Sequence, residues 1–150
     1  AAVDRSTTPW LITAYHRPTY CSVKHGCNAD EAGRLRFQTE KIFHENQVDL
    51  SLQGHVHSYE RTLPVFHQKV GPLAQKLFHG TTYILQGSSG NREGNEGEYP
   101  DDNDPSLPDW SAARHVEVGY GLLTVSKSEL KWEFFKAGTD ELLDSVVMEK

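Results

Sequence analysis

The sequence predicts a mixed α/β domain whose sheet closes in an antiparallel meander, and three observations support this prediction. A strand, a helix and a second strand follow one another near the start of the chain, at residues 10–15, about 30–46 and 48–53. Three more strand-like runs with short turns between them end the chain, at residues 121–125, 130–135 and 142–148. The chain has 150 residues, of which 37% are hydrophobic and 24% charged, so it can bury a core.

Each strand of the strand–helix–strand unit ends beside a histidine. Residues 10–15 are apolar and rich in strand formers, and residues 48–53 alternate in polarity up to Gly54. Such a unit usually makes parallel strands, and ligand sites gather at the carboxyl ends of parallel strands. We therefore expect His16 and His55, which follow the two strands, at the same edge of one sheet.

The helix between these strands has a recognisable start and one apolar face. Asn28, with Glu31 three residues later, is typical of a helix cap. The apolar positions lie at helical spacing and predict a single buried face, made of Leu35, Ile42 and Phe43 with Thr39 between them.

The remaining segments contain one more strand, a long loop and two cysteines. Tyr83 to Gln86 has the pattern of a strand that passes into a glycine-rich segment, and the polar residues 91–110 predict a surface loop. Cys21 and Cys27 lie in the loop before the helix, where either a disulfide or two free thiols would fit. The even cysteine count favours an oxidising compartment.

Charge and hydropathy limit the partners that we expect. The net charge is -6, and no basic run is long enough to follow a nucleic-acid backbone. No stretch approaches the roughly 20 apolar residues of a membrane helix. A phosphorylated substrate would be repelled at long range, so a phosphate site would need concentrated local positive charge, such as bound metal. The first residues enter a strand almost directly, and we expect the chain to be part of a longer protein.

The segment Gly54-His55-Val56-His57 is the sharpest candidate site. Two histidines at i and i+2 of an extended segment point to one side, and they could bind one metal ion or one each of two ions. The alternative is one solvent-facing and one hydrogen-bonded structural histidine. His16 at the end of the first strand, and His25 in the cysteine loop, favour the metal site.

Other polar residues have simpler interpretations. Glu60 and Arg61 form an adjacent pair that we interpret as structural, and Asn91 could reach a substrate or belong to a surface turn. The other four histidines lack the context of a site and are expected to be structural or on the surface: His44, His67, His79 and His115.

Several motifs, in order and approximately in register along nearly the whole chain, resemble the C-terminal half of the purple acid phosphatase catalytic domain. They are PWLITAYHRP at 9–18, VDLSLQGHVHSYER at 48–61, YILQGSSGNREG at 83–94, SAAR at 111–114 and GYGLL at 119–123. The last two resemble the start of the family's closing sheet. The resemblance implies part of a four-layer α/β/β/α metallophosphoesterase sandwich.

The resemblance also implies an acid phosphatase with a ferric ion paired with divalent Zn, Mn or Fe. By position, His16 and His55 would bind the divalent ion and His57 the ferric ion. His25 would contact the phosphate or protonate the leaving group, and Gly26 stands where many plant members have another histidine. The family motifs GDxG, GDxxY and GNH do not occur in this sequence. We therefore expect an active longer protein, with an N-terminal half of the same domain as partner, and an inactive isolated chain.

Two other functions stay open at this stage. One is a non-catalytic binding or structural module of the same fold, and the other is a dinuclear phosphodiesterase that shares the GHxH segment. Like the family, the chain is expected to be secreted or to lie in an endomembrane, vacuolar or lysosomal lumen.

Overall fold

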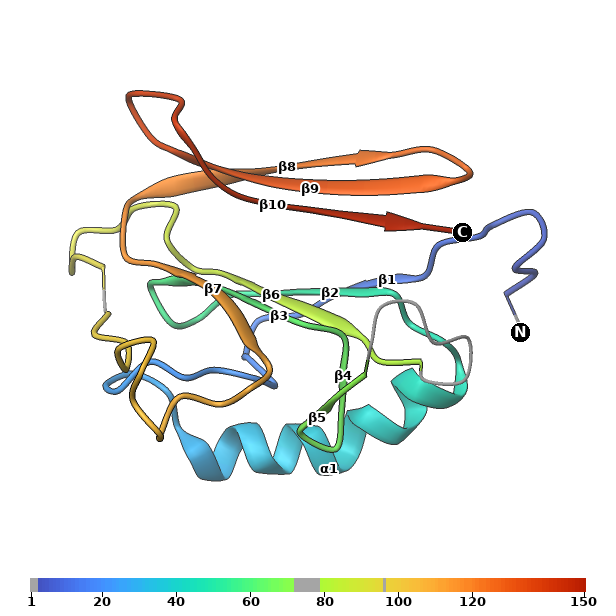
Figure 1. The fold of residues 1–150 in the computed structure, drawn as a ribbon, viewed down its shortest axis with the longest axis horizontal. Helices are drawn as coiled ribbons and strands as arrows, with labels where there is room; N and C mark the ends of the chain where they lie inside the picture. The colour runs from blue at the N-terminus through green and yellow to red at the C-terminus, as the bar shows by residue number, and fades with distance from the viewer. Residues whose placement is uncertain (1–2, 72–78, 96) are drawn as a thin grey trace.

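The computed structural model of the chain describes residues 3–71, 79–95 and 97–150, and this part forms three layers (Figure 1). A five-stranded sheet lies in the middle, one helix covers one of its faces, and a three-stranded sheet packs on the other. The elements are β1 (Ile12–Ala14), α1 (Ala29–Glu45), β2 (Leu50–Gln53), β3 (Tyr59–Thr62), β4 (Val65–Phe66), β5 (Lys69–Val70), β6 (Thr82–Gln86), β7 (Ser111–His115), β8 (Gly119–Val125), β9 (Glu129–Lys136) and β10 (Leu142–Glu149). The described residues form no fourth layer. The four-layer sandwich therefore stays a prediction.

The middle sheet is mixed and has the strand order β1-β2-β6-β3-β7. β1, β2 and β6 are parallel, and β3 pairs antiparallel with both β6 and β7. The predicted unit of parallel strands joined by a helix is therefore confirmed. β3 and β7 were not predicted, because their Ser, Ala, Glu and Arg residues are weak strand formers. Residues 111–114, which the resemblance assigned to the closing sheet, lie in β7 of the middle sheet, and this assignment was wrong.

The predicted antiparallel meander is confirmed as a separate sheet. β8, β9 and β10 pair in the order β10-β9-β8, so the meander packs on the mixed sheet rather than extending it. β4 and β5 form a two-stranded hairpin next to α1 (Figure 1).

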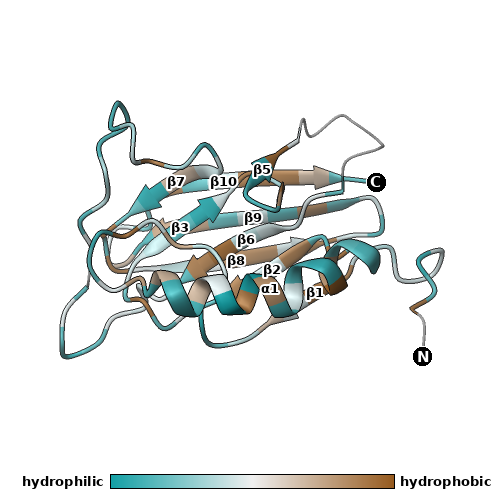
Figure 2. Cartoon of the chain, turned by 90° about the horizontal axis from the view of Figure 1, so that it is seen from below, coloured by the Kyte–Doolittle hydropathy of each residue, from teal (hydrophilic) through white to brown (hydrophobic). Residues whose placement is uncertain are grey.

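The predicted helix and its cap are confirmed, and its buried face is confirmed in part, because Phe43 packs against a buried cluster while Leu35 and Thr39 are half-buried. The Asn28 side chain accepts a hydrogen bond from the Glu31 amide, 3.1 Å away, at the start of α1. Ile42 is 57% exposed, whereas Glu40 is buried. Polar contacts add to the buried side of the helix: Glu40 accepts a hydrogen bond from the Tyr20 hydroxyl, and Arg36 donates to the Thr19 carbonyl. Seen from the helix side, Figure 2 shows hydrophobic residues among hydrophilic ones along α1.

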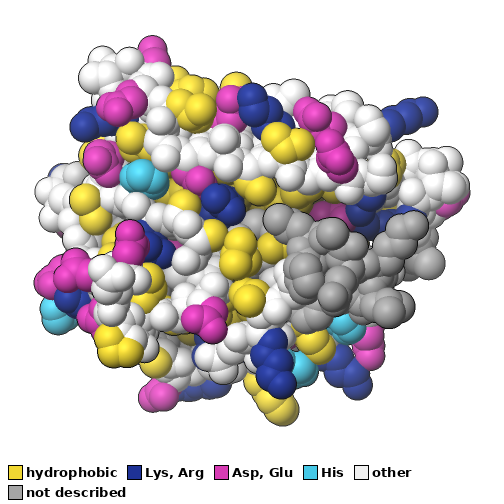
Figure 3. All heavy atoms as spheres, viewed as in Figure 1, with side chains coloured by type: hydrophobic (Ala, Val, Ile, Leu, Met, Phe, Trp, Pro, Cys, Tyr) yellow, Lys and Arg dark blue, Asp and Glu magenta, His cyan; other side chains and the backbone are white. Residues whose placement is uncertain are grey.

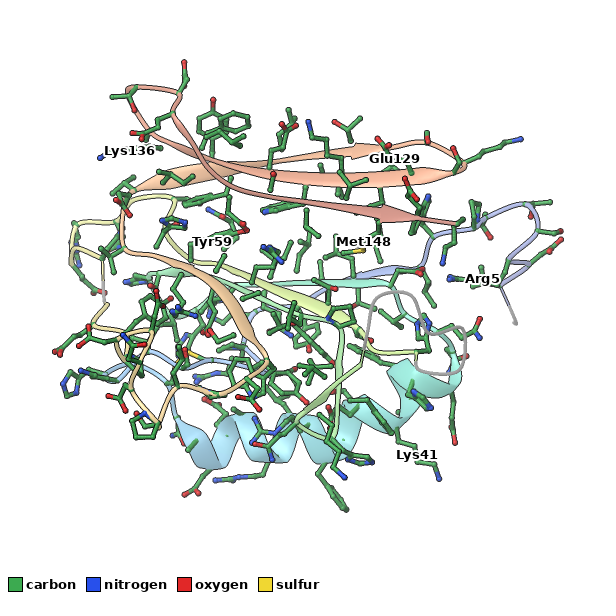
Figure 4. The ribbon with its side chains drawn as sticks, viewed as in Figure 1. Arg5, Lys41, Tyr59, Glu129, Lys136 and Met148 are labelled. Atoms are coloured by element: carbon green, nitrogen blue, oxygen red, sulfur yellow. A yellow bond between two sulfur atoms is a disulfide. The ribbon has the colours of Figure 1, made fainter. Side chains whose placement is uncertain are left out.

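The main apolar core lies between the two sheets. Its buried residues come from both layers: Leu50, Tyr59, Ile84, Leu130, Trp132 and Phe134. Figure 4 shows the side chains of Tyr59 and Met148 in this interior. The Tyr59 ring stacks on Phe134 with centroids 3.9 Å apart, so the strand β3 is fixed to the meander by an aromatic contact.

A polar network closes this core on one side. The Tyr59 hydroxyl donates to Asp144, 2.6 Å away, and accepts from the Trp132 indole at 3.0 Å. The Arg61 guanidinium binds both oxygens of Asp144, at 2.7 and 2.9 Å. Burial would raise the pKa of Asp144, but the hydrogen bonds from Arg61 and Tyr59 outweigh burial and hold this pKa below its usual range.

A second core lies between the middle sheet and the helix layer. It contains Tyr20, Val65, Tyr83 and Trp110, with Phe43 of α1 packed against it. On the face drawn in Figure 3, acidic and basic side chains are interspersed around small hydrophobic areas. No helix in the described part of the chain has the length and apolar character needed to cross a membrane.

We predict that Asp144→Ala lowers the free energy of unfolding by about 3–5 kcal/mol, because it leaves the Arg61 charge buried without its partner. The lowered pKa of Asp144 means that its contribution is present above about pH 4 and is lost as the pH falls further. Urea unfolding at several pH values, followed by tryptophan fluorescence, measures both effects. Asp140→Asn, which keeps an acceptor for the exposed Tyr120 hydroxyl, should change stability by less than about 0.5 kcal/mol. A loss below 1 kcal/mol in Asp144→Ala would contradict the prediction.

Candidate metal site

The parallel pairing of β1 and β2 brings the first two candidate histidines together. Ala14 lies opposite Leu52, and two residues later the Gly54 amide donates to the His16 carbonyl at 3.0 Å. The side chains meet directly: His55 Nδ1 lies 3.1 Å from His16 Nε2, with the ring planes 72° apart. The prediction that these two histidines share one sheet edge is confirmed.

A buried amide fixes the loop that carries His16. Gln53, the last residue of β2, accepts a hydrogen bond from the Thr19 amide at 2.9 Å and donates to the Thr19 and Ser51 hydroxyls at 3.1 and 3.3 Å. It also donates to the Tyr15 hydroxyl. The chain is thus held to the end of β2 on both sides of His16.

The spacing of the two nitrogens fits two ligands of one metal ion. Nitrogens bound to one tetrahedral Zn²⁺ at roughly 2.0–2.1 Å lie about 3.3 Å apart, close to the 3.1 Å between His55 Nδ1 and His16 Nε2. Among residues 3–71, 79–95 and 97–150, no group of three or more His, Cys, Asp or Glu side chains is arranged to hold an ion. The described part therefore brings two histidine nitrogens together, and the assignment of His16, His55 and His57 as metal ligands stays a prediction.

The segment from Gly54 to Ser58 is not extended, contrary to the expectation from the i, i+2 spacing. The Val56 amide donates to the Gly54 carbonyl at 3.0 Å, and the Ser58 amide donates to the Val56 carbonyl at 2.8 Å. These are two consecutive γ-turns, centred on His55 and His57. The φ angle of His55 is 73°, which is the rare and strained form of this turn for a residue with a side chain.

The glycine-rich segment after β6 holds this strained turn from one side. The Gly87 amide donates to the Ser58 carbonyl at 3.0 Å. A Cβ atom on Gly87 would overlap the Val56 carbonyl, so only glycine permits this close approach. Asn91 in the same segment accepts a hydrogen bond from the Glu93 amide at 2.8 Å and is exposed. That contact supports the alternative of a surface turn, while a role for Asn91 toward substrate stays a prediction.

Three contacts hold the loop that carries His25 to the rest of the fold. Cys21 and Cys27 form a disulfide, so of the two alternatives from the sequence the disulfide is found and not the two free thiols. The Lys24 ammonium pairs with Glu98 at 2.7 Å, and this hydrogen bond lowers the pKa of Glu98. His25 itself is exposed on this loop.

Glu60 provides the third attachment and is structural, as predicted, though not as a partner of Arg61. Its buried carboxylate accepts hydrogen bonds from the amide and hydroxyl of Ser22, at 2.8 and 2.5 Å, and from the Ser111 hydroxyl. Burial raises the pKa of Glu60 despite the hydrogen bonds from Ser111 and Ser22. Arg61 pairs with Asp144 between the two sheets instead.

The four histidines set aside in the sequence have contacts elsewhere in the fold. His44 stacks on Phe66 and lies 2.7 Å from the His79 carbonyl, and His79 contacts the Val48 carbonyl at 3.1 Å. His67 is exposed and lies 3.7 Å from Glu40. His115 lies 3.7 Å from Glu117. These contacts give each of the four histidines a neighbour in the fold, and their interpretation as structural or surface residues stays a prediction.

One charged residue beside the histidine pair was missed. Arg17 Nη1 lies 3.1 Å from His55 Nε2 and forms an ion pair with Glu31 of the helix cap. The sequence offered one signal, a cation directly after a candidate ligand.

Part of the chain matches a family model, and most of the chain is similar to named proteins. Residues 80–145 match the family model "Iron/zinc purple acid phosphatase-like protein C". The chain is 36% identical to Purple acid phosphatase 18 of Arabidopsis thaliana over 93% of this chain and 29% of that protein. It is 33% identical to "Probable inactive purple acid phosphatase 1" of the same plant over 100% of this chain and 25% of that protein.

A solved structure has the same fold. The purple acid phosphatase from yellow lupin (Lupinus luteus) seeds superposes with a TM-score of 0.77 and 27% sequence identity, over 99% of this chain and 26% of that chain. The chain thus spans less than a third of the length of these relatives.

We predict that Gly87→Ala lowers the free energy of unfolding by about 1–3 kcal/mol and shifts the ring resonances of His55 and His57, because the Val56 backbone must move. Thermal unfolding and NMR spectra of the histidine rings measure the two effects. Gly33→Ala is the matched control: its new methyl group meets Arg36 at an ordinary 3.8 Å, and it should stabilise α1 by about 0.5–1 kcal/mol. Unchanged ring resonances in Gly87→Ala would show that the segment does not support the turn.

Proposed function

Because this chain belongs to the purple acid phosphatase family, we propose that the protein hydrolyses phosphate monoesters at acidic pH. The observation that carries the proposal is the meeting of His55 Nδ1 and His16 Nε2 at 3.1 Å, in a chain similar to named purple acid phosphatases over most of its length. The proposed centre is a ferric ion paired with divalent Zn, Mn or Fe. Such ions supply an activated water at acidic pH and positive charge for the phosphoryl oxygens.

The residues of this chain have separate proposed roles. His16 and His55 hold the divalent ion and His57 the ferric ion, each as a neutral imidazole. His25 contacts the phosphate or donates a proton to the leaving group, and the disulfide and the Glu60–Ser22 contacts limit the movement of its loop. Because the net charge is -6, these local cations are needed to hold an anionic substrate.

The described residues supply too few ligands for two ions, so we propose that further ligands come from a partner segment. The sequence lacks the GDxG, GDxxY and GNH motifs that carry the family's remaining ligands. The proposed partner is an N-terminal half of the same catalytic domain, and the 150-residue chain alone is proposed to be inactive. The disulfide supports an oxidising location, which we propose to be secreted or within an endomembrane, vacuolar or lysosomal lumen.

A second candidate function is a non-catalytic module of the same fold. It is favoured by the similarity, 33% identity over 100% of this chain, to a relative that carries the word inactive in its name. Aspartates of the family motifs in the preceding segment would favour the phosphatase, and their absence there would favour the module.

We predict that His55→Ala, made in a longer form that contains the preceding segment, lowers kcat/KM for p-nitrophenyl phosphate at acidic pH by at least about 100-fold and lowers the metal content. The reason is the loss of one of two nitrogens that share an ion. His67→Asn, an exposed position with φ 50° that asparagine tolerates, should leave both quantities unchanged. Equal activity of His55→Ala and the unsubstituted protein would refute the assignment.

We further predict that the 150-residue chain alone has no phosphatase activity above background with added Fe³⁺ and Zn²⁺, because carboxylate ligands that bridge two ions are missing. The same assay on the longer form is the positive control. Turnover by the short chain would show that the partner segment is dispensable.

A further inference from the structure

A tyrosine fixes the long loop between β6 and β7 (yellow in Figure 1) to the backbone of the candidate site. The Tyr99 hydroxyl donates to the Tyr59 carbonyl at 2.7 Å and lies 2.7 Å from the Ser58 hydroxyl. Ser58 is buried and directly follows His57. The loop that was predicted at the surface therefore places one side chain against the backbone that leaves the GHVH segment at residues 54–57.

The direction of each hydrogen bond at this contact follows from the chemistry of the groups. A phenol has one proton and a backbone carbonyl only accepts, so the Tyr99 proton is used by the Tyr59 carbonyl. The Ser58 hydroxyl must then donate to Tyr99. Burial raises the pKa of Tyr99, and the nearby Glu60 adds to this effect, so the phenol keeps its proton at acidic and neutral pH. The contact is therefore a chain of two hydrogen bonds, from Ser58 to Tyr99 to Tyr59.

The ring of Tyr99 makes a second, apolar contact with the candidate site. It packs against a buried cluster that contains Val56 and, from the cysteine loop, Val23. Val56 is the residue between the two histidines of the GHVH segment, and Val23 stands two positions before His25. One aromatic ring thus links the loop that carries His25 to the turn that carries other candidate site residues.

The backbone on both sides of Tyr99 is anchored as well. Before it, the Glu98 carbonyl accepts a hydrogen bond from the Lys24 amide at 2.8 Å, and the side chains of Glu98 and Lys24 form an ion pair at 2.7 Å. After it, Pro100 is buried. The fold therefore sets the position of the ring, and Lys24 is the residue directly before His25.

We propose that Tyr99 is a positioning residue of the candidate site: its hydroxyl holds the backbone after His57, and its ring holds the loop of His25 against the GHVH segment. Tyr99 acts through these neighbours and is not itself a catalytic residue. This inference rests on the proposed phosphatase function, because it gives Tyr99 the task of keeping His25 and His57 in a fixed relative position. Small displacements of catalytic groups lower the rate strongly, so such a task matters for turnover.

Two substitutions separate the hydroxyl from the ring. Tyr99→Phe removes both hydrogen bonds and keeps the ring, so the amides of Ser58 and Gly87, which close the turn, should exchange with solvent about ten-fold faster while the Lys24 amide is unchanged. Tyr99→Ala also removes the ring, so the Lys24 amide should exchange about ten-fold faster too. Amide hydrogen exchange of the 150-residue chain, followed by NMR, measures each rate. Unchanged exchange of Ser58 and Gly87 in Tyr99→Phe would overturn the proposal.

A matched control and a second variant test whether the contact acts as one unit. Tyr120→Phe removes an exposed hydroxyl that binds Asp140 on the meander, and it should leave the exchange of the Gly87 amide within about two-fold. Ser58→Ala removes the donor of the same contact from the other side. Added to Tyr99→Phe, it should change the Gly87 exchange rate by less than about two-fold, because the bond between the two hydroxyls is already lost. Independent, multiplicative effects of the two substitutions would contradict the proposal.

In the longer form, a positioning role predicts a change in kcat more than in KM. Tyr99→Phe should lower kcat for p-nitrophenyl phosphate about ten-fold and leave KM within about two-fold, because His57 is then held less firmly relative to His25. Tyr120→Phe should change neither constant. An unchanged kcat of Tyr99→Phe in an active longer form would overturn the positioning role. Faster exchange of Ser58 and Gly87 in Tyr99→Phe, together with an inactive longer form, would support the contact and remove only the proposed phosphatase activity.

Discussion

The site depends on one constraint, the fixed parallel register of β1 and β2 at their carboxyl ends. The ladder ends with the Gly54 amide on the His16 carbonyl, and the buried Gln53 amide ties Thr19 to the same point. Because side chains alternate along a strand, a shift of one residue would turn His16 to the other face of the sheet. The hydrogen bonds of this buried amide make such a shift costly, since water would not replace them in the interior. The meeting of two imidazoles is therefore a consequence of sheet pairing.

The contacts that stabilise the fold lie between the two sheets, whereas the candidate site lies at the end of the middle sheet. The packing of Tyr59 on Phe134, and the Arg61–Asp144 pair beside it, lie between the two sheets. The histidine pair lies at the end of the middle sheet. β3 connects the two regions, because it begins directly after the GHVH segment and sends Tyr59 into the core between the sheets. Only Ser58 separates Tyr59 from His57, so we expect a displacement of Tyr59 in the core to displace His57 as well.

Periodicity and strand ends could be predicted from the sequence because they are local properties. The unit of β1, α1 and β2, the meander and the shared edge of His16 and His55 all follow from such patterns. The burial of Glu40 and the exposure of Ile42 on α1 did not follow, because Glu40 is held by a hydrogen bond from Tyr20 and not by hydrophobicity. β7 was missed for a similar reason, since its pairing with β3 compensates for residues of low strand propensity.

The geometry inside the site was the least predictable part, because it depends on contacts between segments far apart in the sequence. The turn at His55 needs a positive φ that isolated histidine disfavours, and the distant Gly87 supports it through a hydrogen bond to the Ser58 carbonyl. These contacts are made entirely by this chain, so the fold itself offsets the strain of the turn. The backbone around the two histidines is therefore positioned by the pairing of β1 with β2 and by the close approach of Gly87 to Val56.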